Sequence, residues 1–145
     1  MKSIVWVGLN PSPKNTTPET AFVGSPSGKN LAKWQVEVDR KVKSPLQHKM
    51  YNLCTVVSSS ERTVSQAMAD VGAITRILMH YSNNDTIVAL GNKASKILLA
   101  NNIPHLKMPH PSPSNRQLNN HVFIKNKLKY LKNNIKLASK YWNCL

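Results

Sequence analysis

The chain has 145 residues and 41% hydrophobic content, enough for one domain that buries most of its apolar surface without disulfides or metals. We expect a single domain over residues 1–145. No apolar run approaches the roughly 20 residues that span a bilayer, and residues 4–9 are too short and too soon followed by Asn-Pro to be a signal-peptide core. The sequence therefore predicts no membrane contact and a cytoplasmic location, or one wherever the genome lies.

Charge points to a polyanionic partner. Sixteen Lys and four Arg against six acidic residues give a formal net charge of +14, which nucleic acid would balance. Asp85 is the last acidic residue, so residues 86–145 carry nine Lys and one Arg and no negative charge. A compositional bias toward Lys and Asn, as in an AT-rich genome, remains an alternative, but it does not explain the missing carboxylates.

Cysteine and histidine give no metal signal. Cys54 falls in an apolar run and is expected to be a small core residue rather than half of a disulfide. Two Cys are too few for a four-cysteine iron–sulfur cluster, and the five His lack the spacing of zinc ligands. We expect no metal and no cofactor.

The pattern of elements predicts an α/β domain. Continuous apolar runs predict buried parallel strands over residues 3–9, 49–57, 86–90 and 105–108. Helical patterns lie between them, over residues 30–42, 64–81 and 92–100. This order predicts three layers, α/β/α, with a central four-stranded, mostly parallel sheet.

The last helix has the clearest periodicity. Spacings of four and three place one apolar set on a single face, which we expect to pack on the core: Ile124, Leu128, Leu131, Ile135 and Ala138. A stripe of lysines lies about 100° round the axis, made of Lys125, Lys129, Lys132, Lys136 and Lys140. It is either a solvated face or a source of unspecific, salt-sensitive DNA affinity.

Polar motifs fall at the predicted strand ends. Asn10 follows the first strand, Asn52 lies within the second, Gly91-Asn92 follows the third, and His110 follows the fourth. Because ligands of open α/β sheets bind at the carboxyl ends of strands, we expect these residues to converge on one edge.

The segment around His110 is rigid, polar and basic. It reads Pro109-His110-Pro111-Ser112-Pro113-Ser114-Asn115-Arg116, and its prolines fix the backbone and remove amide donors. Such rigidity suits a catalytic loop, although Ser, Pro and Asn are also common in ordinary surface turns.

Together, two motifs resemble those of the uracil-DNA glycosylase superfamily: Gly-x-(Asp/Asn/Glu)-Pro after the first strand and His-Pro-Ser after the last. Here they read Gly8-Leu9-Asn10-Pro11 and His110-Pro111-Ser112-Pro113. Each is weak alone, but the ordered pair at opposite ends of a βα pattern is much stronger. The resemblance spans Val5 to about Leu131 and implies the superfamily's fold, no cofactor, and a monomer acting on single- or double-stranded DNA.

The resemblance implies catalytic roles for two residues. Asn10 would hold the attacking water through its side-chain carbonyl, and His110 would hydrogen-bond the leaving base at O2 as negative charge gathers there. Asparagine accepts no proton, so we expect a slower enzyme than one with a carboxylate. An Asn-Pro turn and an exposed loop histidine are the alternatives, and Glu19 is a candidate general base or else a solvated carboxylate.

The base pocket would be formed by residues from three segments. Gly8, Pro11 and Ser12 belong to the first motif, Phe22 matches the aromatic on which the flipped base stacks, and Asn52 matches the reader of the pyrimidine edge, since its amide both donates and accepts. A core phenylalanine and a structurally satisfied asparagine are the alternatives. Ser12 replaces the tyrosine that blocks 5-methyl groups in the classical branch, so 5-substituted pyrimidines are expected substrates.

DNA contacts are expected from two further segments: Ser25, Ser27 and Lys29 after the first motif, and Ser112, Ser114, Asn115 and Arg116 in the second. Ser114 stands where the classical branch has a bulky leucine wedge, which predicts weak flipping of paired bases and a preference for single strands. We therefore expect a monofunctional glycosylase that leaves an abasic site. A catalytically silent binding module is the alternative, and a nucleotide hydrolase is disfavoured because there is no Gly-rich phosphate loop.

Overall fold

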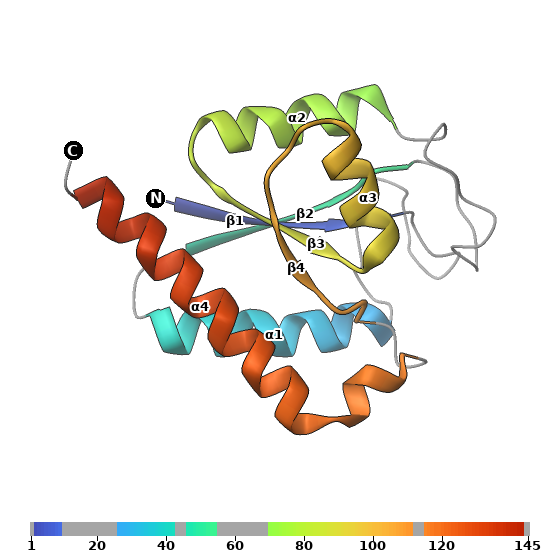
Figure 1. Ribbon diagram of the computed structural model, residues 1–145, viewed down its shortest axis with the longest axis vertical. Coiled ribbons are helices and arrows are strands. Elements are labelled where there is room, and N and C mark those ends of the chain that lie inside the picture. The colour runs from blue at the N-terminus through green and yellow to red at the C-terminus, as the bar shows by residue number, and fades with distance from the viewer. Residues whose placement is uncertain (1, 10–25, 43–45, 55–69, 112–114, 144–145) are drawn as a thin grey trace.

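The computed structural model describes residues 2–9, 26–42, 46–54, 70–111 and 115–143 (Figure 1). Its elements in chain order are β1 (Lys2–Gly8), α1 (Pro26–Val42), β2 (Leu46–Asn52), α2 (Val71–Ser82), β3 (Thr86–Leu90), α3 (Asn92–Ala100), β4 (Leu106–Met108), the 3-10 helix η3 (Arg116–Asn119) and α4 (His121–Asn143).

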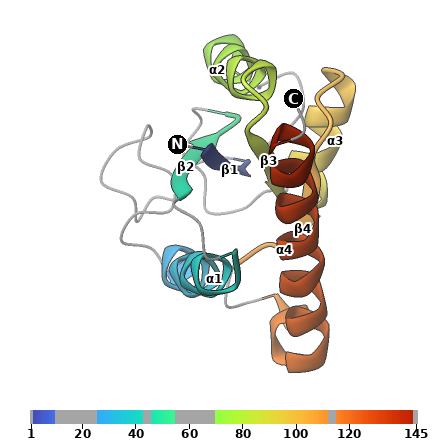
Figure 2. The same ribbon diagram turned by 90° about the vertical axis from the view of Figure 1, so that its left-hand side faces the viewer.

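The four described strands form one parallel sheet in the order β2-β1-β3-β4. Helices α1 and α4 pack on one face of the sheet and α2 and α3 on the other (Figure 2). The chain therefore winds outward in both directions from β1 and β3, which confirms the three-layer α/β/α fold expected from the order of elements.

Successive residues of the central strands feed two separate cores. In β1, Ile4 and Trp6 pack toward α1 and α4, whereas Val5 and Val7 pack toward α2 and α3, and all four are fully buried. Side chains alternate between the faces of a strand, so a strand covered on both sides must be apolar throughout. The last helix contributes Leu128, Leu131 and Ile135 to the first core, as its periodicity predicts.

A hydrogen-bonded chain satisfies the polar atom of the largest buried side chain. The Nε1 of Trp6 donates to Nδ1 of His48 over 3.0 Å, and Nε2 of His48 lies 2.8 Å from a carboxylate oxygen of Asp39. The indole N–H would otherwise be an unsatisfied donor inside the core.

The sequence predicts the second strand over residues 49–57, and this prediction starts too late along the chain. The structure begins β2 at Leu46 and ends it at Asn52, paired from Lys2↔Leu46 to Gly8↔Asn52. β2 is an edge strand whose exposure alternates, so a search for continuous apolar runs misses its first residues. Asn52 consequently ends the strand instead of lying within it.

Two helix starts also differ from expectation. α1 begins at Pro26, four residues before the start predicted at residue 30, because the polar first turn has no apolar periodicity and proline suits the first helical position. α2 begins at Val71, and residues 64–69 of its predicted range lie outside the described residues. Its N-cap is Asp70, whose extended backbone breaks any helix at that point.

Asp70 joins α2 to the end of the second strand. Its side chain accepts a hydrogen bond from the backbone N of Ala73 over 3.0 Å, and its own backbone N donates to the carbonyl of Leu53. Cys54 is fully buried beside these residues and is a core residue, as expected. Burial raises the pKa of the Cys54 thiol, and the negative charge of Asp70 raises it further.

Asp70→Ala is expected to lower the free energy of unfolding by about 1 kcal/mol, because it removes the side-chain acceptor from the N-terminus of α2. Asp70→Asn keeps an N-cap acceptor without the charge and should retain most of the stability. Urea denaturation followed by circular dichroism measures both. Equal losses in the two variants would mean that charge, and not capping, is the source of the stabilisation.

Candidate active site

The carboxyl ends of all four strands lie at one edge of the sheet, because every pairing is parallel. Gly8 at the end of β1 pairs with Asn52 at the end of β2, and Leu90 at the end of β3 pairs with Met108 at the end of β4. Of the residues expected to converge on this edge, Asn52, Gly91-Asn92 and His110 therefore lie there, whereas Asn10 lies outside the described residues. The winding direction reverses between β1 and β3, where ligands of such sheets bind.

Asn52 presents an unpaired amide at this edge. Both Oδ1 and Nδ2 of its side chain are buried, and neither has a hydrogen-bond partner within the part of the chain that the structure describes. An unsatisfied buried polar group costs about 1–3 kcal/mol. Only one other described side chain has such an atom, Gln35 at its Nε2. Asn52 is thus suited to a ligand that offers one donor and one acceptor.

Gly91 brings the β3–α3 turn against His110. Its φ of 96° lies in the region that favours glycine, and a Cβ at this position would lie 3.4 Å from the Cβ of His110. The backbone N of Gly91 also donates to the carbonyl of Met108 over 2.9 Å. The positive φ, and not a lack of space, therefore favours glycine at residue 91, and the turn lies within van der Waals distance of His110.

The segment that carries His110 is braced from two sides. Nδ2 of Asn115 donates to the carbonyl of His110 over 2.9 Å, while Oδ1 of the same side chain accepts from the backbone N of Gln117 over 3.1 Å. On the other side, Nδ2 of Asn30 in α1 donates to the carbonyl of Pro111 over 2.8 Å. These bonds hold the motif between α1 and η3 without a helix or strand of its own.

Two of the expected DNA-binding cations lie on the surface. Arg116 begins η3 and is exposed, and Lys29 is exposed in the first turns of α1. Ser27 belongs to α1. Seven other expected site residues lie outside the described residues: Asn10, Pro11, Ser12, Phe22, Ser25, Ser112 and Ser114, and so does Glu19.

A hollow of about 510 Å³ opens beside His110. Besides the motif residues His110 and Asn115, its lining includes Lys107, Phe123 and Lys127, which sequence reasoning missed. The available signals were the absence of acidic residues after Asp85 and the spacing of four between Phe123 and Lys127, which places both on one side of α4.

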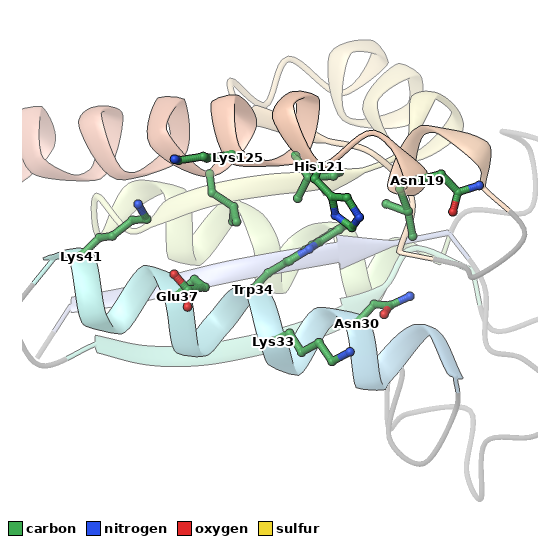
Figure 3. Close-up of a pocket in the computed structure, with 11 residues that line it drawn as sticks. Asn30, Lys33, Trp34, Glu37, Lys41, Asn119, His121 and Lys125 are labelled. Atoms are coloured by element: carbon green, nitrogen blue, oxygen red, sulfur yellow. The ribbon is translucent and has the colours of Figure 1, made fainter.

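A second cavity of about 600 Å³ lies between α1 and the η3–α4 segment, away from the strand ends (Figure 3). Trp34 of α1 and His121 of α4 extend toward one another across it, and its described lining also includes Lys33, Lys41 and Lys125 and one carboxylate, Glu37. It lies on one face of the sheet, and Asn30 in its lining also bonds to the carbonyl of Pro111.

Within the described ranges, no three His, Cys, Asp or Glu side chains cluster as metal ligands would. None of the helices there has the length and apolar character needed to cross a bilayer.

The comparisons with known proteins give one match. Neither the comparison with curated proteins nor that with solved structures finds a similar chain. The family model for the uracil DNA glycosylase superfamily matches residues 2–139, which include both the Gly8-Leu9-Asn10-Pro11 and the His110-Pro111-Ser112 motifs. With that match over nearly its whole length, and with the superfamily's sheet and motif placement, the chain belongs to the uracil-DNA glycosylase superfamily.

Proposed function

We propose that this protein is a monofunctional DNA glycosylase that removes uracil or a 5-substituted pyrimidine from DNA and leaves an abasic site. The observation that carries the proposal is the amide of Asn52, buried and unpaired at both ends within the described structure. A pyrimidine edge offers a carbonyl O4 and an N3–H to an amide that donates and accepts. A flipped base would form hydrogen bonds with both unsatisfied atoms of the amide, and these bonds would recognise the base.

His110 would act on the opposite side of the base. It follows β4 at the same sheet edge, and the hydrogen bonds from Asn30 and Asn115 to the carbonyls of Pro111 and His110 fix its segment before substrate arrives. A donor that is already oriented stabilises negative charge on O2 of the leaving base without reorganising in the transition state.

Asn10 would position the nucleophile. The water oxygen bonds to C1′ of the sugar as the bond from C1′ to the base nitrogen breaks, and the electron pair of that bond leaves with the base. The proton that the water loses passes through solvent to the base anion. Superfamily membership and the first motif support this role. No lysine is needed as a Schiff-base nucleophile, so the DNA strand stays intact after base release.

The same proposal extends to the partner and its setting. Ser25, Ser27, Lys29, Ser112, Ser114 and Arg116 would contact the DNA around the extruded nucleotide, with Asn115 bracing the loop. The protein would act as a monomer in the compartment that holds this DNA, and Ser12 would leave room for a substituent at C5.

Asn10→Ala is expected to lower base release by roughly 10²-fold or more, because water loses its fixed position, while DNA affinity stays nearly unchanged. Oligonucleotides carrying uracil, hydroxymethyluracil, hypoxanthine or modified cytosines, single- and double-stranded, are incubated with protein and then cleaved at abasic sites with hot alkali. Asn133→Ala, an exposed change on α4, is the matched control. Retained DNA binding without release from any oligonucleotide by the unaltered protein would instead support a silent binding module.

Asn52→Leu is expected to leave the free energy of unfolding unchanged or raise it, because an apolar side chain of similar shape replaces an unpaired amide. Base release from uracil substrates should nevertheless fall by roughly 10²-fold. Gln35→Met removes the other buried amide nitrogen that lacks a partner in the described structure, and it should leave base release intact. If Asn52→Leu destabilised the fold while its activity per folded molecule stayed normal, the amide would be structural.

A further inference from the structure

The hollow beside His110 continues along α4 as a longer groove. This hollow of about 510 Å³ shares the lining residues Lys107, Phe123 and Lys127 with a neighbouring hollow of about 340 Å³, which reaches Tyr130. We call the two together the β4–α4 groove. One end is therefore at the candidate active site, and the other lies about two helical turns further along α4.

The groove combines positive charge with aromatic rings. Lys93, Lys107 and Lys127 line it, and none of the described residues that line it is a carboxylate. Nζ of Lys127 lies 5.7 Å from the centre of the Phe123 ring and 5.9 Å from that of Tyr130. Cation–π attraction thus holds an ammonium group between two aromatic side chains, and 47% of the Tyr130 surface stays exposed.

Such a surface fits single-stranded DNA better than a duplex. A basic groove follows the phosphate backbone, and aromatic side chains stack on bases whose faces are uncovered. In a duplex those faces are occupied by the neighbouring base pairs. Hydrogen-bonding groups at the active-site end, including Asn92, whose Oδ1 accepts from Nζ of Lys107 over 2.6 Å, add polar contacts that do not select a sequence.

We propose that the β4–α4 groove binds the single-stranded DNA that flanks the nucleotide in the active site, with Lys127 on a phosphate and Tyr130 stacked on a base. This inference rests on the proposed function, which identifies the active site, but it concerns a surface outside both motifs. It assigns the substrate class, since a strand that enters through this groove is unpaired beside the target base.

The experiment measures binding without catalysis. Fluorescein-labelled oligothymidine of 15 residues, which contains no uracil, is titrated with full-length protein by fluorescence anisotropy at several salt concentrations. Tyr130→Ala should weaken binding about tenfold, the order expected for one lost base–aromatic stack. Lys127→Gln should also weaken binding and reduce the slope of log affinity against log salt by about 0.7, as one single-strand phosphate contact requires.

Matched controls separate the groove from general charge and aromaticity. Lys125→Gln removes the same charge on the opposite flank of α4, beside α1 (Figure 3), and Tyr81→Ala removes an exposed tyrosine from α2. Both should bind like the unaltered protein. Equal losses of affinity in the groove and control variants would overturn the proposal. It would also be overturned if the groove variants lost as much affinity for a 15-base-pair duplex as for the single strand.

Base release is measured separately on a uracil-containing single strand. If the unaltered protein releases no base but the groove variants bind the single strand more weakly, the proposed groove is supported and the proposed glycosylase activity is rejected. If the unaltered protein releases uracil but the groove variants bind normally, the activity is supported and the groove is rejected. Circular dichroism of Tyr130→Ala and Lys127→Gln checks that the exposed changes leave the fold unaltered.

Discussion

Parallel pairing of β1 with both β2 and β3 is the constraint from which the site follows. It brings residues 8, 52 and 91 to one edge although they come from distant parts of the chain. It also buries the central strands on both faces, which requires them to be almost entirely apolar. Within β1 and β3, polar side chains are therefore confined to the strand ends, and the carboxyl edge is where the candidate site gathers.

The same edge carries a rigid segment, which follows β4, and an unsatisfied buried amide, which ends β2. The segment of His110 is held by hydrogen bonds from side-chain amides in α1 and in the loop before η3. Asn52, in contrast, keeps two buried atoms without partners in the described structure. A stable fold alone would favour an apolar residue at position 52. The asparagine is consistent with selection for a ligand that completes its hydrogen bonds.

The fold could be predicted from sequence where periodicity was strong and could not where it was weak. β3 and α3 match the predicted bounds because a continuous apolar run ends at Gly91 and an amphipathic pattern follows. The predicted start of β2 is three residues late because Gln47 and His48 interrupt the apolar pattern at the sheet edge. The start of α2 could not be predicted from periodicity, because it is fixed by the extended backbone of Asp70 and by its side-chain cap on Ala73.

The candidate site shows the same division. Asn52 and His110 could be named because motifs carry them, and Gly91-Asn92 because it ends a strand. The bracing by Asn30 could not be foreseen, since it joins residues 81 positions apart. Phe123, Lys127 and Tyr130 were indistinguishable from an ordinary helix surface until the hollow beside them was known.

The two outer strands have a consequence for the behaviour of this protein at high concentration. β4 is three residues long with an exposed lysine at its centre, and β2 exposes Gln47 and Lys49 along its length. Short or charged border strands give a foreign strand little to pair with. Crowding of many copies on one nucleic-acid molecule therefore carries little risk that neighbouring sheets will fuse into aggregates.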